Sequence, residues 1–367
     1  MLLPKASVIV AMPPSCRTES AETVVGITAV KPSRSSSALE HLPIALDAMG
    51  GDNAPSQIVE GALAAAAEHG ISVMLVGRPD ELGDVGNLEV LPASEVIPME
   101  ADAGSSVRRM KDSSLVRAAE AVRDGRASAM VSAGNTGATM ASALLRMGRI
   151  KGVSRPAIAT PVPRLKGSPT LLLDAGANTE CSPEMLLQFA RLGLVYSRDR
   201  YGVQTPKVAL LSIGEESNKG NSLVKDTHKA IANLPWGQLG AEFVGNVEGR
   251  DLMTDAADVV VTDGFTGNVA LKALEGGMKT LIGGLLDAFG SSPEAEAAAG
   301  VLAPSLEPLY RKFDPDTYGS AVLLGVNGLC MVSHGSSSAS AISNALVTTA
   351  ELLSTNLVEH LRSAIAT

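Results

Sequence analysis

The chain has 367 residues, 45% hydrophobic and 19% charged, with a formal net charge of −9 at pH 7. The negative charge argues against nucleic acid as a general partner, and no apolar run approaches the ~20 residues of a membrane-spanning helix. The 3 cysteines lie far apart and the 5 histidines show no metal-ligand spacing. The sequence therefore predicts no disulfide framework, no metal and no cofactor.

The first 42 residues are interpreted as a tail outside the fold. Residues 7–12 are apolar, but only Lys5 precedes them and a poor cleavage site follows, so they make a weak signal peptide. Residues 19–41 are polar and show no periodicity. We expect a disordered leader at 1–42 and one folded domain at 43–367.

The folded part repeats a strand, a glycine-bearing turn and a helix. The first unit has a strand at 44–49, a helix at 56–69 and a second strand at 71–76. Low aromatic content and many small residues suit an α/β protein with helices packed closely on a sheet. Strands that end in small, polar or charged residues recur at 129–138, 170–178, 207–221, 243–251 and 257–272. Ligands bind at the carboxyl ends of strands in such sheets, and chance does not explain all five turns.

A basic segment lies between the first unit and the strand at residue 129. Arg108, Arg109 and Lys111 precede a helix at 115–124. Three cations in four positions suit an anionic substrate or an acidic protein partner, whereas a solvated face is the simpler interpretation of the same spacing.

Residues 257–272 are the most informative stretch. An apolar β-branched strand ends at Asp263-Gly264, and Thr266 is a candidate N-cap for the following helix. Such a turn directs backbone N–H groups and a partial positive charge at one spot, which favours an anion. The alternative is an ordinary turn whose glycines only relieve crowding. The turn at 134–137 also combines Gly, Asn and Thr, which favours a shared site.

The segment after this helix is predicted to form a helical hairpin. A turn at 290–294 precedes a second helix that runs to about Phe313 and is broken at Pro304. Closing strands are expected at 322–328 and 329–333, and a last helix at 336–362. The first hairpin helix carries an apolar stripe that suits either the core or a dimer contact, formed by Met278, Leu281, Ile282, Leu285, Leu286 and Phe289.

Several motifs together resemble the bacterial phosphate acyltransferase family. They lie at 47–52, 132–138, 148–152, 259–272 and 334–337, and the likeness covers the chain from about Ile44 onward. The family makes acyl-phosphate from acyl-(acyl carrier protein) and orthophosphate for phospholipid synthesis. Its fold is similar to that of phosphotransacetylases and isocitrate dehydrogenases.

The resemblance implies a three-layer α/β/α sandwich with a mostly parallel, doubly wound sheet and a helical hairpin inserted at about 275–313. It also implies a homodimer in the cytoplasm, at the inner face of the membrane. There the product would pass to a membrane glycerol-phosphate acyltransferase. The polar hairpin tip at 290–292 weakens a direct lipid contact in this chain.

Acyl transfer from a thioester to phosphate sets the chemical requirements. The phosphate dianion is the nucleophile, and the thioester oxygen needs hydrogen-bond donors as it gains charge. A thiol with a pKa of about 8.5 leaves with little protonic help. Alignment of the two reactants supplies ~7–11 kcal/mol of the barrier. No Ser-His-Asp triad is required, and the sequence has no G-x-S-x-G elbow.

The candidate residues follow from these requirements. The catalytic candidates are Asp263, Lys219 and His334, and Lys219 supplies positive charge together with Arg250. Asp263 either orients phosphate or takes its proton, or instead pairs with Lys219 or Arg250. His334 either donates to the thioester oxygen or sulfur, or is structural. The docking of an acidic carrier is assigned to Arg108, Arg109 and Lys111. The phosphate-binding candidates are Asn135, Thr136, Gly137, Arg250, Thr266, Gly267 and Asn268.

Two other classes of protein are weighed against this enzyme. A non-catalytic sensor of phosphate or acyl carrier would have the same fold, but the cations and both Gly-Asn-Thr turns are present. A dehydrogenase is disfavoured because the G-x-G-x-x-G dinucleotide fingerprint is absent at the first turn.

Overall fold

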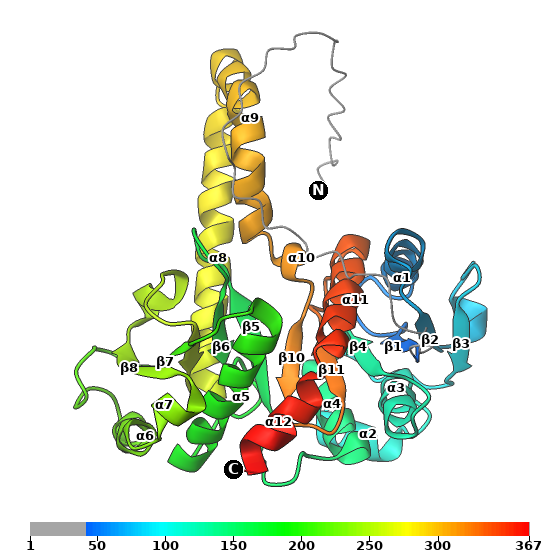
Figure 1. Cartoon of the computed structure of the whole chain (residues 1–367). Helices are drawn as coiled ribbons and strands as arrows, with labels where there is room; N and C mark the ends of the chain where they lie inside the picture. The colour runs from blue at the N-terminus through cyan, green and yellow to red at the C-terminus, as the bar shows by residue number, and fades with distance from the viewer. Residues whose placement is uncertain (1–41, 367) are drawn as a thin grey trace, which may run out of the picture. The chain divides into compact units, whose positions relative to one another are not determined.

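A computed structural model describes residues 42–366, so the predicted leader lies, except for Leu42, outside the described residues. In this part of the chain a single sheet has the strand order β3-β2-β1-β4-β11-β10-β5-β6-β9-β7-β8 (Figure 1). Its strands are β1 Ile44–Asp47, β2 Val73–Gly77, β3 Glu89–Pro92, β4 Ala129–Ser132, β5 Ala157–Val162, β6 Thr170–Leu173, β7 Lys207–Leu211, β8 Glu242–Val247, β9 Val259–Val261, β10 Ala321–Leu324 and β11 Leu329–Val332.

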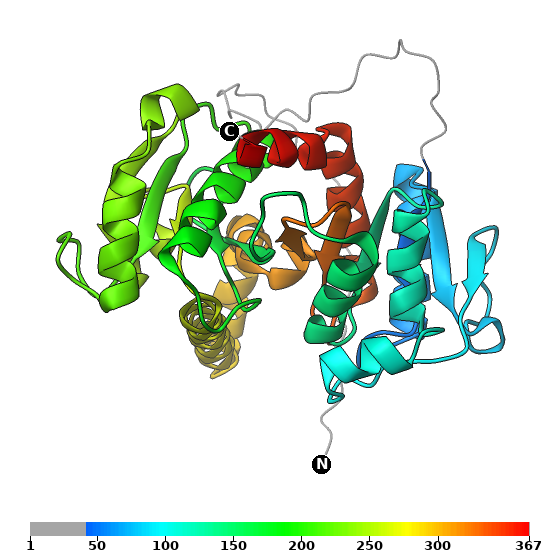
Figure 2. The same cartoon turned by 90° about the horizontal axis from the view of Figure 1, so that it is seen from below.

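Helices connect the strands and cover both faces of the sheet (Figure 1, Figure 2). The α-helices are α1 Ser56–His69, α2 Ala103–Arg109, α3 Ser114–Arg123, α4 Thr136–Ser142, α5 Pro183–Tyr201, α6 Ser222–Ala232, α7 Trp236–Leu239, α8 Gly264–Phe289, α9 Pro293–Phe313, α10 Pro315–Tyr318, α11 Ala339–Ser354 and α12 Leu357–Ala366. The shorter elements are the 3-10 helices η1 Pro79–Glu81 and η3 Gly249–Met253 and the π-helix η2 Ala143–Met147.

Alternating strand residues separate the two faces, as the twofold periodicity of a strand requires. In β1, Leu46 packs in a cluster with α1, α5, α11 and α12, whereas Ala45 packs in a different cluster with α3 and α4. Farther along the sheet, Val260 of β9 packs against Ala270 and Leu274 of α8. The result is the predicted three-layer α/β/α sandwich.

The sheet is mostly parallel, but its two halves run in opposite directions. Neighbouring strands are parallel in seven pairs. The three antiparallel pairs join β11 to β10, β10 to β5 and β5 to β6. The carboxyl ends of β1, β4 and β11 therefore form one edge, here called the first edge. Those of β6, β7, β8 and β9 form the second edge.

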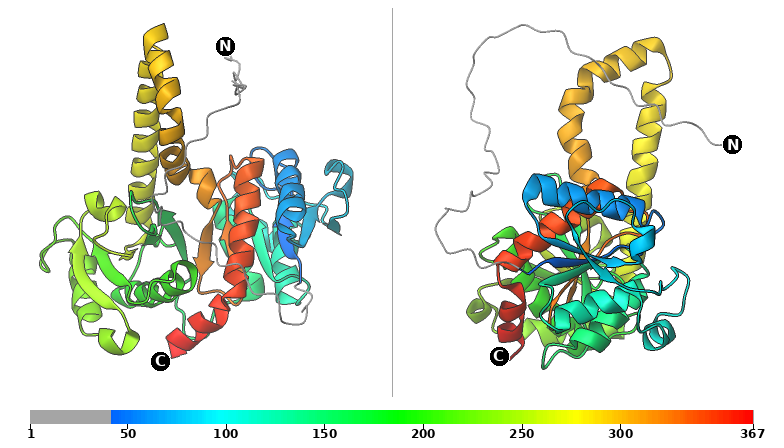
Figure 3. Two further views of the ribbon diagram at one scale, coloured as in Figure 1. Left: turned by 45° about the horizontal axis from the view of Figure 1, so that its top comes forward. Right: turned by 90° about the vertical axis from the view of Figure 1, so that its right-hand side faces the viewer.

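The predicted hairpin consists of α8 and α9, which project together from the rest of the domain (Figure 3). Only the first turn of α8 is buried, at Gly264 and Gly267. Its predicted apolar stripe is not core within this chain, because Leu281 is 68% exposed and Leu286 is 62% exposed. None of the described helices is long and apolar enough to cross a membrane.

Three predicted helix boundaries are wrong. The N-cap of α8 is Asp263 and not Thr266, because the Asp263 carboxylate accepts from the Thr266 N–H at 2.8 Å. Helix α9 continues through Pro304, since a proline removes one intrahelical donor while the bonds around it persist. The last helix is two helices, because Asn356 adopts a φ of 57° between α11 and α12.

The strand predictions agree with the structure at β1, β2, β4, β6, β7, β8 and β9. The sequence analysis missed β3 and β5. Strand β3 contributes only one buried residue, and β5 contains Pro161, so neither has the continuous apolar run of a buried strand.

Candidate functional site

The strand directions divide the predicted site residues into two groups. Asn135, Thr136, Gly137 and His334 follow β4 and β11 at the first edge, whereas the turns of β7, β8 and β9 lie at the second edge. β4 and β9 are five strand spacings apart, ~24 Å along the sheet at about 4.8 Å each. The sheet is mixed, so the turns at 134–137 and 264–268, which the sequence analysis expected to share a site, follow strands of opposite direction.

The two groups nevertheless share one face of the sheet. Ala138 and Ala141 of α4 belong to the same hydrophobic cluster as Ala177 and Leu271, the latter from α8. Helices α4 and α8 thus lie in one layer, and the core between them is continuous.

The second edge is built around the first turn of α8. Both oxygens of the half-buried Asp263 carboxylate are engaged, by the Thr266 N–H and the Thr266 hydroxyl, each at 2.8 Å. The Gly264 N–H donates to the Asn178 carbonyl at 2.7 Å, and the Gly267 N–H donates to the Asp263 carbonyl at 2.9 Å. These backbone donors are already used, so an incoming anion would meet mainly the exposed side chains of Thr266 and Asn268.

The two glycines of this turn are needed for close packing. A Cβ atom on Gly267 would lie 1.9 Å from the Asp174 carbonyl oxygen, and one on Gly264 would lie 2.6 Å from the Asn178 carbonyl oxygen. Real Cβ atoms do not approach backbone so closely. The interpretation that these glycines relieve crowding therefore holds, whatever the turn binds.

Asp174 organises the loop on which α8 rests, and the sequence analysis gave it no role. It is fully buried at the end of β6, and one carboxylate oxygen accepts the N–H groups of Ile158, Gly176 and Ala177 at 2.9–3.1 Å. The other oxygen accepts from the Asn178 N–H and side-chain amide, both at 2.8 Å. Burial raises the pKa of Asp174, and hydrogen bonds from Ala177, Asn178, Ile158 and Gly176 oppose that rise. The sequence feature that could have indicated this role is the position of the aspartate between an apolar strand and a glycine-bearing turn.

Asp47 has the corresponding place at the end of β1. It is 2% exposed, and its carboxylate accepts from the Ser132 hydroxyl at 2.7 Å and the Met49 N–H at 3.3 Å. Burial raises the pKa of Asp47, while hydrogen bonds from Ser114 and Ser132 lower it. A Cβ atom on Gly50 would lie 2.5 Å from this carboxylate, so each edge is assembled around a buried aspartate.

At the first edge, Asn135 ties a loop to the start of α4. Its Oδ1 accepts from the Ala138 N–H at 2.9 Å, while its Nδ2 donates to the Met99 carbonyl at 2.6 Å and the Ala101 carbonyl at 3.1 Å. The Asn135 side chain therefore caps α4 with its oxygen and holds the loop at residues 99–101 with its NH2 group. Thr136 beside it is exposed, and Gly137 packs against Ala103.

His334 lies at the same edge, in the turn after β11. Its Nδ1 accepts from the Ser336 N–H at 3.2 Å, so in this arrangement the ring proton is on Nε2. The Gly335 carbonyl accepts from the Asp52 N–H at 2.7 Å, which joins this turn to the turn after β1. The side chain is exposed, and its ring carries a donor toward solvent.

The two predicted cations at the second edge are both exposed. Arg250 in η3 is 71% exposed and pairs with Glu248 at 2.8 Å and Glu215 at 3.5 Å. Lys219 forms no ion pair with any residue in the 42–366 range. Within this same range neither cation pairs with Asp263, so the alternative of an ion pair there is not observed.

The basic segment predicted to dock a carrier is at the end of α2. Arg108, Arg109 and Lys111 are all exposed, and the first two help to lower the pKa of Asp102, after the hydrogen bonds from Ser105. Helix α2 packs on α4, which places these cations beside the first edge.

The two cysteines among the described residues carry protonated thiols at neutral pH. Burial raises the pKa of Cys181 and of Cys330 to about 12, so both are thiols at neutral pH. Cys16 lies outside the described residues. No cluster of three metal-ligating side chains occurs in the part of the chain that the structure covers.

Comparison with solved structures identifies the class of fold. The domain is similar to a phosphotransacetylase from Streptococcus pyogenes, with a TM-score of 0.57 and 16% identity over 86% of this chain and 94% of that chain. A branched-chain phosphotransacylase from Enterococcus faecalis V583 gives a TM-score of 0.56 and 15% identity over 85% of this chain and 99% of that chain. At these identities the likeness shows the fold alone.

Sequence comparison then identifies the family. The model of the family described as "Fatty acid synthesis protein" matches residues 42–360, and the chain belongs to this family. A protein named Phosphate acyltransferase from Heliobacterium modesticaldum is 48% identical over 312 residues, which are 83% of this chain and 91% of that protein. Another of the same name, from Elusimicrobium minutum, is 47% identical over 334 residues, 88% and 96% of the two chains.

Proposed function

We propose that the protein is an acyltransferase that moves a fatty acyl group from acyl-(acyl carrier protein) to orthophosphate and forms acyl-phosphate for phospholipid synthesis. One observation carries this proposal: identity of 47–48% with proteins named Phosphate acyltransferase extends over more than four-fifths of each chain. The phosphotransacetylase fold supports it, because members of that fold class also carry names of acyl transfer involving phosphate.

The reaction follows from the chemistry of the two substrates. A phosphate oxygen attacks the thioester carbonyl carbon, and the new C–O bond forms as the carbonyl π electrons move to oxygen. Collapse of this tetrahedral intermediate breaks the C–S bond, and the carrier leaves as a thiolate. No enzyme nucleophile is required, which agrees with the protonated state of Cys181 and Cys330.

The second edge supplies the proposed phosphate contacts. The side chains of Thr266 and Asn268 extend from the first turn of α8, whose N-terminal partial charge favours an anion. Lys219 and Arg250 add positive charge, provided that Arg250 exchanges a carboxylate of Glu215 or Glu248 for phosphate. The Thr266 hydroxyl donates to Asp263, so its contact with phosphate requires that proton to turn from the carboxylate to the anion.

The first edge supplies the proposed contacts to the donor. His334 carries an exposed Nε2–H donor at the first edge, so it suits the carrier or its arm and not the thioester oxygen attacked by a phosphate at the second edge. Thr136 and Gly137 lie at the start of α4 beside it, with Asn135 holding that helix in place. Arg108, Arg109 and Lys111 form an exposed basic surface for an acidic carrier.

A homodimer formed through the hairpin is proposed as the assembly. Leu285 of α8 and Val301 of α9 are 46% and 79% exposed, an unusual amount of apolar surface for helices of one domain. Positions 276, 277, 283 and 284 are glycines with nothing within 4 Å of an added Cβ atom. Each glycine costs ~0.5–1 kcal/mol relative to alanine inside a helix, so a close approach by a second copy would explain them.

The same proposal places the protein in the cytoplasm, associated peripherally with the inner face of the membrane. There the acyl-phosphate would pass to a membrane glycerol-phosphate acyltransferase. The exposed apolar hairpin supports this location, while the polar tip at 290–292 argues that the contact is not deep insertion.

One assay tests the proposed function. The purified protein is mixed with acyl-(acyl carrier protein) and orthophosphate, and acyl-phosphate and free carrier are measured, with sulfate replacing phosphate as the control. We expect equal amounts of both products, only with phosphate. Binding of both substrates without turnover would instead identify a sensor of the same fold and contradict the proposal.

A further inference from the structure

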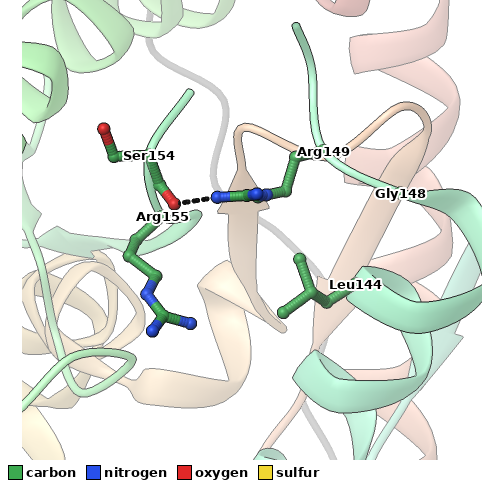
Figure 4. A pocket seen from close by; sticks show the side chains of 5 residues that line it. All are labelled: Leu144, Gly148, Arg149, Ser154 and Arg155. Carbon is green, nitrogen blue, oxygen red and sulfur yellow. Dashed lines mark hydrogen bonds between the residues drawn. The ribbon is translucent and has the colours of Figure 1, made fainter. Parts of the chain in front are cut away.

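A cavity of about 770 Å³ lies outside every residue assigned above. Its walls are Leu144 of η2 and four residues of the loop that leads to β5, which are Gly148, Arg149, Ser154 and Arg155 (Figure 4). The two arginines and Leu144 face one opening from different sides. The cavity therefore combines positive charge with one apolar wall.

Both arginines in this cavity lack an acidic partner. Arg149 donates to the backbone carbonyl of Ser154, and Arg155 forms no side-chain hydrogen bond or ion pair with any residue in the described range. Several other arginines pair with a carboxylate, as Arg146 does with Glu120 and Arg164 with Asp258. Two unpaired guanidinium groups in one cavity repel each other and attract an anion.

The cavity opens at the second edge, next to the proposed phosphate site. Pro156, which follows Arg155, accepts from the Asn178 side-chain amide at 2.8 Å. Asn178 in turn accepts from the N–H of Gly264, the first residue of α8, at 2.7 Å. One loop therefore links the arginines to the helix turn that carries Thr266.

We propose that this cavity binds the phosphate group on the organic arm of the acyl donor, and this assignment rests on the proposed function. Paired guanidinium groups match the oxygens of a phosphate bidentately. A cavity of several hundred Å³ is typical of ligands with an organic part and exceeds what a bare phosphate ion needs. The phosphodiester of a carrier's pantetheine arm has this chemistry, and the arm then lies along Leu144 toward α8. Orthophosphate is the other source of a phosphate group.

Calorimetric titration with two small molecules tests the assignment without catalysis. We expect 4′-phosphopantetheine to bind about 10-fold or more tightly than pantetheine, because only the former offers a charged partner to the arginines. Arg155→Ala should reduce that preference by about 3-fold, half of it on a logarithmic scale, and the pair Arg149→Ala and Arg155→Ala should abolish it. Arg126→Ala, an exposed arginine outside the cavity, is the matched control and should change nothing.

Steady-state kinetics separate the two sources of phosphate. Arg155→Ala should raise KM for acyl-(acyl carrier protein) and leave KM for orthophosphate unchanged. Since Arg149 also holds the loop, Arg149→Lys with an unchanged circular dichroism spectrum serves as its second variant. Equal binding of the two small molecules to the unmodified protein, or a rise only in the orthophosphate KM, would overturn the assignment. Absence of acyl-phosphate formation with intact phosphopantetheine binding would refute the proposed function alone.

Discussion

Replacing Asp174 by asparagine should remove two of the five hydrogen bonds that hold the loop under α8. Three backbone donors can still use the remaining oxygen, but the new NH2 group would face the N–H and the side-chain amide of Asn178, each now 2.8 Å from the carboxylate. A buried donor left without an acceptor costs about 1–3 kcal/mol, so the free energy of unfolding should fall by about 2–6 kcal/mol. This is a large part of the ~5–15 kcal/mol of a typical domain.

Thermal and chemical unfolding measure this change directly. At about 2 °C per kcal/mol, the low end of the range for domains of about 150–250 residues, Tm should fall by ~4–12 °C. Asp47→Asn is the matched variant, because it replaces the buried aspartate of the other edge. Its partner is the Ser132 hydroxyl, which can rotate and accept from the new NH2 group, so a smaller loss is expected.

The same variant has a consequence for binding. Gly264 and Gly267 of α8 contact the loop of Asp174, so loosening the loop should displace Thr266 and raise KM for orthophosphate. The donor KM should rise less. The opposite result in stability would refute this reasoning. That result is an Asp174→Asn variant as stable as the unmodified protein together with a less stable Asp47→Asn variant, because only the former leaves donors without an acceptor.

Three further predictions concern separate parts of the chain. Gly267→Ala places a Cβ atom 1.9 Å from the Asp174 carbonyl oxygen, so it should destabilise the protein by more than ~1–3 kcal/mol in urea unfolding, and an unchanged midpoint would contradict the close packing. Arg250→Ala should raise the phosphate KM about 10-fold with little change in stability, because Arg250 is 71% exposed; an unchanged KM would remove it from the site. With a pKa of about 12, Cys181 is thiolate to about one part in 10⁴ at pH 8. In a Cys16→Ser variant, which removes the cysteine outside the described residues, iodoacetamide should therefore react slowly at pH 8 and faster as pH rises. Rapid labelling at pH 8 would show that the Cys181 thiol is not buried.

Strand positions could be predicted because each buried strand is an uninterrupted apolar, β-branched run, as in Val259–Val261. The direction of a strand relative to its neighbours is not indicated by any comparable sequence pattern. Nothing in the composition of β5 or β10 indicates that they run against their neighbours, so the division of the site residues between two edges could not be foreseen.

The roles of individual side chains were predictable only where local geometry decides them. Asp263 and Thr266 both suit a helix start, and the spacing of three residues between them permitted the correct cap, yet the sequence alone favoured the threonine. Asn135 was assigned to phosphate because its turn, like that at 264–268, combines Gly, Asn and Thr. Its side-chain amide also donates to the carbonyl groups of residues 98, 99 and 101, which are distant in the sequence. Contacts of this kind depend on the tertiary fold.

Helix α8 is a single rod of 26 residues, ~39 Å at 1.5 Å each. Its inner end carries Asn268, and its outer leucines Leu281, Leu285 and Leu286 are 46–68% exposed. Next to Asn268, Gly267 packs closely against the Asp174 carbonyl and fixes the inner end of the helix on the domain. A surface that binds these outer leucines would therefore contact the same helix whose first turn carries the proposed phosphate contacts.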